Sequence, residues 1–382
     1  MKGSRVPTLY DGSVRQPAEV WRSLRRRRAA PPGSATSSPS RADTFRSALE
    51  QAEQQFRAAA SVDYDSRALN LYYGASQAGR ALAATARVLG PDSWTLRGHG
   101  LKAHLGDVTT SVAVVGIEPD GKTNASFTRL SSVLQSPLPG LVTLGELWPS
   151  MYETTLHAPL GDTQHPPLHV HLGERLSVGA RGLDTATIEL PHAITDTPVE
   201  ERPPLSEFLG RYPALAGWRT ATPAGTEVGW PEPNQAFELQ WELTDTDGRS
   251  GHVVGDRLTR YRKHQMAFPT VAGEAAALHP LMAWWGVLYA LSMLTRYQPA
   301  EWTALIDVNN SQHATAVEFV LDAALAAVPD LLDERSISFR SQGGPAATAM
   351  VGNRSRLDDR ARRGWSPVPM QPHQRDGDPT AR

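Results

Sequence analysis

The segment Arg97-Gly98-His99-Gly100, together with His104, holds side chains that could act on RNA. An imidazole can move a proton at a ribose 2′-hydroxyl while a guanidinium steadies the phosphate. Arg97 and His104 are separated by six residues and form a candidate pair for metal-independent cleavage. In the alternative interpretation, Arg97 and His99 hold a turn through hydrogen bonds to the backbone, and His104 is an ordinary surface residue. Because Arg-His spacings this loose often arise by chance, we favour the alternative and assign no catalytic residue.

A second group of polar residues could bind a ligand. Tyr73 and Arg80 lie on a polar stripe of a long apolar helix, His99 follows that helix, and Arg296 ends a later apolar segment. Arginine side chains commonly bind phosphate or carboxylate groups. We expect Tyr73, Arg80, His99 and Arg296 to line one cleft, which is the leading hypothesis for a binding site. In the alternative, Arg296 pairs with Glu301 or with a tyrosine of the central helix and only orients two helices.

Three imidazoles lie close together in the sequence at His165, His169 and His171, with Glu174 after them. On a strand His169 and His171 would share a face, a geometry that could hold zinc. No standard zinc signature is present, and Pro166-Pro167 makes the position of His165 unpredictable. We therefore interpret this stretch as an exposed strand edge and expect no metal. The sequence also lacks a P-loop and a dinucleotide-binding fingerprint, so no cofactor is expected.

The candidate binding residues depend on a helix predicted from Ser66 to Leu89. Asp65 or Ser66 can cap its start, and Gly90-Pro91 is expected to end it. The small residues Gly74 and Gly79 would let a neighbouring helix approach closely. Residues at helical spacing form one apolar face, which comprises Leu71, Ala75, Ala78, Leu82, Ala86 and Leu89.

Further helices are predicted at both ends of the chain. Residues 19–28 could form a short helix that docks through Trp21 and Leu24, and Thr44–Ala60 is a clear amphipathic helix. The apolar run Leu281–Arg296 is expected to be a buried core helix rather than a membrane span, because its richly apolar part is too short. A proline-started helix follows at residue 299, and a last one is capped by Ser311.

The middle of the chain favours strands. The predicted strands have β-branched or alternating composition and occupy 108–117, an extended run ending near Leu130, 168–178, 183–190 and 236–243. The last of these is expected to pair with 252–261. A capped helical turn is predicted at 143–152 and a short helix at 206–215.

This order of elements predicts an α+β fold, in which the helices of the two ends form one core and a β-rich insertion lies between them. The expected organisation is a disordered tail at 1–16, one domain at 17–342 and a disordered basic tail at 343–382. Within the domain, residues 17–106 are helical, 107–265 are β-rich and 270–335 are helical.

Composition limits the classes of function. The chain has 382 residues and no cysteine, which excludes disulfides, thiolate metal sites and cysteine nucleophiles. Its net charge of −2 is uneven, because residues 1–43 carry +6 and residues 341–382 carry +3, which leaves −11 for the part between them. We interpret the basic Arg26-Arg27-Arg28 run as part of a solvated tail. With no signal-peptide pattern, we expect a cytoplasmic protein without membrane insertion. A nucleic acid or nucleotide partner and a homodimer stay open.

Several stretches, in this order, resemble the YaaC-like protein family. They are the Trp21 segment with Ala29–Gly33, the helix TFRSALEQAEQQF at 44–56, LYYGASQAGRAL at 71–82, RGHGL at 97–101 and HPLMAWWGVLYALSMLTRYQPAEW at 279–302. The resemblance covers most of the body, with the β-rich middle its least distinctive part. It implies a bacterial protein without an assigned substrate, which we expect to be a non-catalytic binding or interaction protein.

The pair YYGASQAGRAL and GHGL also resembles the helix-turn-helix pair of HEPN domains, an all-α superfamily that includes ribonucleases and nucleotide-binding modules. This local resemblance covers about forty residues. It implies the alternative function, a metal-independent ribonuclease that uses Arg97 and His104.

Overall fold

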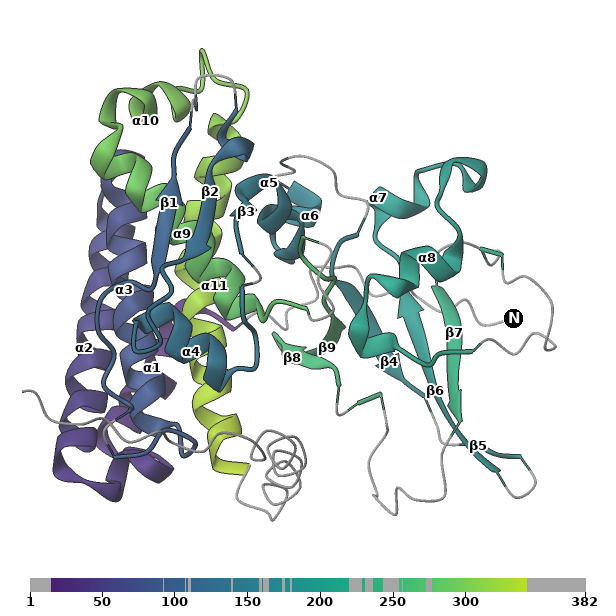
Figure 1. Cartoon of the computed structure of the whole chain (residues 1–382), viewed down its shortest axis with the longest axis horizontal. Helices are drawn as coiled ribbons and strands as arrows, with labels where there is room; N and C mark the ends of the chain where they lie inside the picture. Colours follow the sequence, from purple (N-terminus) through teal and green to yellow (C-terminus); the bar gives the residue numbers. More distant parts are fainter. Residues whose placement is uncertain are drawn as a thin grey trace, which may run out of the picture. The chain divides into compact units, whose positions relative to one another are not determined.

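Two apolar helices from opposite ends of the sequence pack against each other. They are α3 (Tyr64–Thr85) and α9 (Pro280–Tyr297), which are neighbours in Figure 1. Gly79 permits the close approach, because a Cβ at this position would lie 2.3 Å from the Trp285 ring. The predicted contact between the early and the late apolar segment is confirmed.

The computed structural model describes most of the chain between residues 15 and 341. The predicted tails fall mainly outside this range, at 1–14 and 343–382. The described residues up to Arg340 belong to one compact unit. Inside the range, the residues that are not described are 92, 107, 109–110, 139, 158–159, 161–164, 174–175, 179–180, 220–228, 231–235, 243–253, 256 and 273–276.

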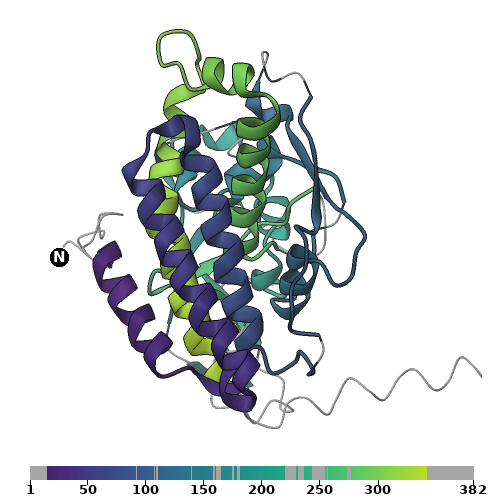
Figure 2. The ribbon, with the colours of Figure 1, turned by 90° about the vertical axis from the view of Figure 1, so that its left-hand side faces the viewer.

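Helices lie at both ends of the described chain and sheets lie between them, so the predicted α+β class is confirmed. Figure 2 shows the helices of the two ends side by side. Besides α3 and α9, they are α1 (Pro17–Ala29), α2 (Pro39–Ser61), α10 (Pro299–Leu305) and α11 (Ala314–Ser341).

The basic N-terminal segment is folded rather than a solvated tail. The run Arg26-Arg27-Arg28 lies in the last turn of α1, and the Nε of Arg27 donates to the buried carboxylate of Asp333 at 2.7 Å. Arg15, which the sequence placed in the disordered tail, also pairs with Asp333 and with Asp330 of α11. The prediction for the arginine run was wrong, because buried carboxylates far along the chain attract these guanidinium groups.

The central helix ends about one turn before the predicted Gly90-Pro91 stop. It ends at Thr85, whose carbonyl accepts a hydrogen bond from Ser34 Oγ at 2.8 Å. Arg41 of α2 donates to the carbonyl of Leu89 at 2.5 Å. These side chains satisfy carbonyl groups that would otherwise accept within the helix, so tertiary contacts end α3 early.

The apolar helix α9 is buried along its length, from Pro280 to Leu294. His279 caps its start by accepting the Leu281 N–H at Nδ1, at 3.0 Å. Within the described residues, no helix is both long and apolar enough to cross a membrane. The prediction of a buried core helix is confirmed.

A small three-stranded sheet follows α3, in the order β1 (Leu101–His104), β2 (Gly116–Pro119) and β3 (Val142–Thr143). The predicted strand at 108–117 was wrong in its first part, where the described residues include a short 3₁₀ turn, η2 (Val112–Val114). The predicted extended run to Leu130 was also wrong. Its end is the helix α4 (Ser126–Val133), whose Phe127 and Leu130 are buried in the helical core.

The larger sheet has the order β5-β6-β4-β9-β8, with β7 added to β6. All its described pairings are antiparallel. The predicted pairing of residues 236–243 with 252–261 was wrong, because β7 pairs with β6 along seven residues instead. The strands are β4 (Leu168–Leu172), β5 (Leu176–Val178), β6 (Arg181–Glu189), β7 (Ala236–Glu242), β8 (Thr259–Tyr261) and β9 (His264–Ala267).

Short helices connect and cover these strands. The capped turn predicted at 143–152 is confirmed, since Thr143 and Glu146 form a reciprocal capping box at the start of α5. The helix predicted at 206–215 is split into α8 and η5, and a proline rather than a serine precedes it. The short helices are α5 (Leu144–Leu147), η3 (Trp148–Ser150), α6 (Thr154–His157), α7 (His192–Thr195), η4 (Val199–Glu201), α8 (Leu205–Gly210) and η5 (Pro213–Leu215), and η1 (Gly33–Ser37) lies near the N-terminus.

The described side chains form two hydrophobic cores. One contains the long helices and the small sheet, and the other lies between the larger sheet and α8. The β8–β9 hairpin joins the first core through Tyr261 and Met266. Its two-residue turn, Arg262-Lys263, has positive φ at both positions, as the twist of a tight hairpin requires. There Arg262 Nη2 lies 3.0 Å from Glu153 Oε1, and the same oxygen accepts the Tyr261 hydroxyl.

Candidate anion-binding site

The loop that carries His99 is fixed against the start of α4. Gly98 and Gly100 have positive φ, and a Cβ at Gly100 would lie 2.9 Å from the Phe127 nitrogen. The Phe127 N–H donates to the His99 carbonyl at 3.0 Å, and Ser126 Oγ donates to the Gly98 carbonyl at 2.7 Å. Only glycine tolerates this combination of backbone angle and close contact. The loop therefore holds His99 in a defined position.

Two tyrosines, one from each central helix, surround the imidazole. The Tyr72 hydroxyl of α3 lies 2.7 Å from His99 Nδ1. Tyr289 of α9 packs its ring 5.9 Å from the His99 ring and 5.4 Å from the Tyr72 ring. Its hydroxyl donates to the Leu101 carbonyl at 2.8 Å. The α3–α9 contact thus positions His99 from two sides.

Both tyrosines remain protonated hydrogen-bond donors. Burial is the main cause that raises the pKa of Tyr72 and of Tyr289 above the ordinary value for a phenol. When His99 carries its proton on Nε2, Tyr72 donates to Nδ1 and the Nε2–H group is left as a donor. The cluster can then offer one imidazole N–H to a ligand.

The charge near His99 is positive. Burial lowers the pKa of His99, the charges of Arg296 and Arg80 lower it further, and Asp120 acts in the opposite direction. The positive charge of Arg296 also lowers the pKa of Tyr72 and Tyr289. The charges of Arg80 and Arg296 therefore both act on His99, and the cleft that these residues are expected to line stays a prediction.

Neither arginine has a carboxylate partner among the residues that the structure describes. Arg80 is half-buried, and its Nε is buried without a hydrogen-bond partner. Arg296 is exposed, and its guanidinium lies over the ring of Tyr297 at 5.1 Å. Arg296 does not pair with Glu301 in the described contacts, although the alternative interpretation of the sequence expected that pair. Both guanidinium groups keep donors for an anion.

Sequence reasoning chose Tyr73 of α3, and the tyrosine that contacts His99 is its neighbour Tyr72. Tyr73 is 37% exposed, and its ring lies 5.9 Å from the Tyr72 ring. Tyr297 is 63% exposed at the end of α9. Two exposed aromatic rings therefore lie beside the positive cluster. Tyr72 and Tyr289 were missed, although a tyrosine on an otherwise buried helix often marks a hydrogen bond at its hydroxyl.

The Arg97/His104 pair has a different setting. The backbone of Arg97 forms a bridge with Ala125, and its side chain is exposed. His104 ends β1, and its Nε2 lies 3.2 Å from Glu118 Oε1 on the neighbouring strand. The segment after the glycines is a strand, where the helix-turn-helix resemblance implied a helix. In the described contacts, His104 is associated with a carboxylate and not with Arg97.

The predicted histidine strand is β4, which is an interior strand rather than an exposed edge, because it pairs with both β6 and β9. His169 and His171 share a face as predicted, with stacked rings 6.5 Å apart. His165 stacks on Phe208 instead, and Glu174 lies outside the described residues. Among the described residues, no group of three metal-binding side chains is arranged to hold an ion.

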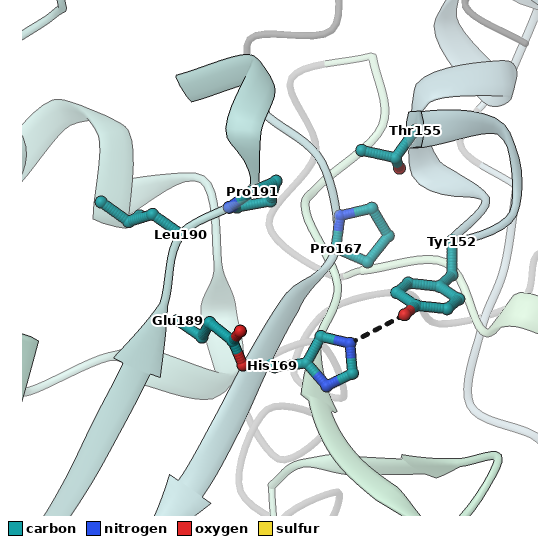
Figure 3. Close-up of a pocket in the computed structure, with 7 residues that line it drawn as sticks. All are labelled: Tyr152, Thr155, Pro167, His169, Glu189, Leu190 and Pro191. Carbon is teal, nitrogen blue, oxygen red and sulfur yellow. Dashed lines mark hydrogen bonds between the residues drawn. The ribbon is translucent and has the colours of Figure 1, made fainter. Parts of the chain in front are cut away.

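His169 is part of a small pocket between the helical core and the larger sheet (Figure 3). Its Nε2 lies 3.0 Å from the Tyr152 hydroxyl, and the Glu189 carboxylate lies at the same pocket. Burial, together with the charge of His264, lowers the pKa of His169 to about 4. The pocket has a volume of about 20 Å³, which is room for about one water molecule. It is therefore a site of internal hydrogen bonding and is too small for a ligand.

Comparison with known protein families gives a match, which covers most of the chain. The YaaC-like protein family matches residues 18–335, which include the loop of His99 and both central helices. Searches of curated proteins and of solved structures gave no match. The matched range comprises most of the sequence and contains every residue of the candidate site. On this match, the chain belongs to the YaaC-like protein family.

Proposed function

We propose that this protein is a non-catalytic binding protein whose ligand is a nucleotide, held at Arg80, His99 and Arg296. The observation that carries the proposal is the pair of guanidinium groups that have no carboxylate partner within the described part of the chain, both close enough to lower the pKa of His99. A phosphate accepts hydrogen bonds from guanidinium and imidazole N–H groups and neutralises the local positive charge.

The exposed tyrosines favour a nucleotide over inorganic phosphate. Tyr73 and Tyr297 offer aromatic faces beside the positive cluster, and a base can stack on such a face. The guanidinium of Arg296 lies over the Tyr297 ring, so the aromatic surface there also carries a positive charge. A phosphate with an attached base would use both features.

The charge of the protein favours a small ligand over a long nucleic acid. The chain between the basic ends carries −11, and a duplex or long strand would be repelled by such a surface outside the immediate site. A mononucleotide contacts only the local positive cluster.

Calorimetric titration with adenosine monophosphate tests the proposal. We expect binding by the wild type and a dissociation constant about 10-fold or more higher for Arg296→Met and for Arg80→Met, because each removes a charged hydrogen-bond donor. Arg87→Met is the matched control, since Arg87 is an exposed arginine beyond the end of α3. Equal affinity of Arg296→Met and Arg87→Met would contradict the proposal.

The same preparation tests the ribonuclease alternative. Single-stranded RNA incubated with the wild type should stay intact and should bind no more tightly than the mononucleotide. RNA cleavage that is lost in His104→Gln would favour the Arg97/His104 enzyme instead. If the protein binds RNA tightly but does not bind the mononucleotide, its ligand is a nucleic acid and the nucleotide proposal is wrong.

A further inference from the structure

A second, larger cavity lies where the helical core meets the β8–β9 hairpin. It has a volume of about 340 Å³, which is within the size range of small-molecule sites. Residues that follow α4, the 3₁₀ turn η5, the strands β8 and β9, the start of α9 and the end of α11 all contribute to its lining. Its lining includes Arg257, His279 and Arg335, and no aspartate or glutamate lines it among the residues that the structure describes.

His279 supplies a hydrogen-bond donor whose acceptor is missing. Its Nδ1 accepts the Leu281 N–H at 3.0 Å, so the proton of the neutral ring is on Nε2. The side chain is only 7% exposed, and burial together with the charge of Arg335 holds its pKa well below the ordinary value. The Nε2 atom is buried and has no hydrogen-bond partner among the described residues. Buried donors normally have partners, which makes this one unusual.

Arg335 supplies a guanidinium group in the same cavity. It lies near the end of α11 and is half-buried, and burial lowers its pKa in spite of the neighbouring Glu334. No ion pair or hydrogen bond of its guanidinium occurs within the described part of the chain. Arg257, on the β8 side, donates from Nη1 to the Ala216 carbonyl at 2.8 Å. The cavity is thus lined by positive charge, and its wall includes His279 with its buried, unpartnered Nε2–H group.

The remaining lining is mixed, because Gln135, Ser136 and Thr259 are polar and the other side chains are apolar. Met266, Phe268 and Leu278 contribute buried side chains to the walls, together with Leu134 and Pro213. Such a wall favours an apolar or aromatic group over a strongly hydrated one. Inorganic anions alone would leave this surface unused.

We propose that this cavity binds a small organic anion, whose carboxylate or phosphate oxygens accept hydrogen bonds from His279 Nε2–H and the Arg335 guanidinium while its apolar part contacts Phe268 and Met266. The two donors are far apart in sequence, since His279 is the N-cap of α9 and Arg335 belongs to α11, and the aromatic wall comes from the chain after β9. This site is separate from the nucleotide site, because none of its lining residues belongs to the His99 cluster.

Calorimetric titration of the full-length protein with benzoate, phenyl phosphate and benzamide tests the proposal. The three probes share a phenyl ring, and benzamide lacks the negative charge. We expect at least one of the two anions to bind and benzamide not to bind measurably. The tighter anion identifies carboxylate or phosphate as the preferred group. Binding of benzamide as tight as that of the anions, or binding of none of the three, would overturn the proposal.

Two variants remove the proposed donors separately. Arg335→Met should raise the dissociation constant of the bound anion by about 10-fold or more. His279→Asn keeps a good N-cap for α9 but removes the Nε2–H donor, and it should weaken binding by about 5-fold or more. The control Arg87→Met should bind the probes as the wild type does. If both Arg335→Met and His279→Asn bind the probe anion as tightly as the wild type, the proposal is overturned. This outcome is independent of the adenosine monophosphate titrations, which test Arg80 and Arg296.

Discussion

Replacement of Arg262 by methionine is expected to lower the free energy of unfolding by about 3–5 kcal/mol. Arg262 Nη2 lies 3.0 Å from Glu153 Oε1, and the two side chains are 12% and 6% exposed. Without the guanidinium, the Glu153 carboxylate would remain buried, and among its described contacts the Tyr261 hydroxyl alone would compensate its charge. Methionine keeps much of the volume of the side chain, so the loss reports charge rather than packing. Urea unfolding followed by circular dichroism measures the change.

A double variant separates this electrostatic effect from a general weakness of the hairpin. Glu153→Gln with Arg262→Met removes both charges but leaves an amide oxygen that can accept the Tyr261 hydroxyl. We expect the double variant to regain most of the stability that the single variant loses, because no buried charge is left unpaired. A double variant as unstable as Arg262→Met alone would show that the ion pair is not the cause.

Replacement of Gly79 by leucine is expected to cost about 3 kcal/mol of unfolding free energy, at the upper end of the usual range for overpacking. A Cβ at this position would lie 2.3 Å from Cζ3 and 2.4 Å from Cη2 of Trp285. The Trp285 ring is fully buried and packs edge-on against Phe127 at 6.5 Å, so it has little room to move. The substitution would separate α3 from α9.

The matched control is the same substitution at a glycine in open space. No atom lies within 4 Å of a Cβ built at Gly210, at the end of α8. Gly210→Leu should therefore change the stability by less than about 1 kcal/mol. Because α3 and α9 also hold Tyr72 and Tyr289 around His99, Gly79→Leu should weaken nucleotide binding as well. Wild-type stability of Gly79→Leu would contradict the close packing of the two helices.

The contact between α3 and α9 could be predicted from the sequence because it depends on local composition. A helix that is apolar on most of its surface must be buried, and the glycines of α3 indicate a close neighbour. The end of α3 could not be predicted in the same way. Ser34 and Arg41 capture the carbonyls of Thr85 and Leu89 from a distant part of the chain, and propensity contains no information about such contacts.

The β-rich middle shows the same limit. The individual strands β4, β6 and β7 follow from alternation, but their neighbours in the sheet do not. β7 pairs with β6 because Phe237 and Leu239 then join the core beneath the sheet, and β4 becomes an interior strand. The expectation of an exposed edge was therefore wrong for His169, which is buried.

At the proposed binding site, the sequence suggested the charged residues but not the two tyrosines that pack around His99. Arg80, His99 and Arg296 belong to segments whose order and composition suggested a common location, and their charges interact in the fold. Tyr72 and Tyr73 differ by one position, or about 100° around the helix, and it is Tyr72 whose hydroxyl reaches His99. The cavity at His279 and Arg335 has no sequence signal, since its donors come from distant helices.

The pKa of His99, followed by NMR titration of its imidazole, tests the central claim most directly. We predict a pKa below the ordinary value of 6.5 in the free protein, because burial and the charges of Arg296 and Arg80 disfavour the imidazolium. The pKa should rise in Arg296→Met, and it should rise when adenosine monophosphate is added, because the phosphate charge stabilises the imidazolium. A pKa of His99 that is ordinary and unchanged by both the substitution and the nucleotide would contradict the proposed site.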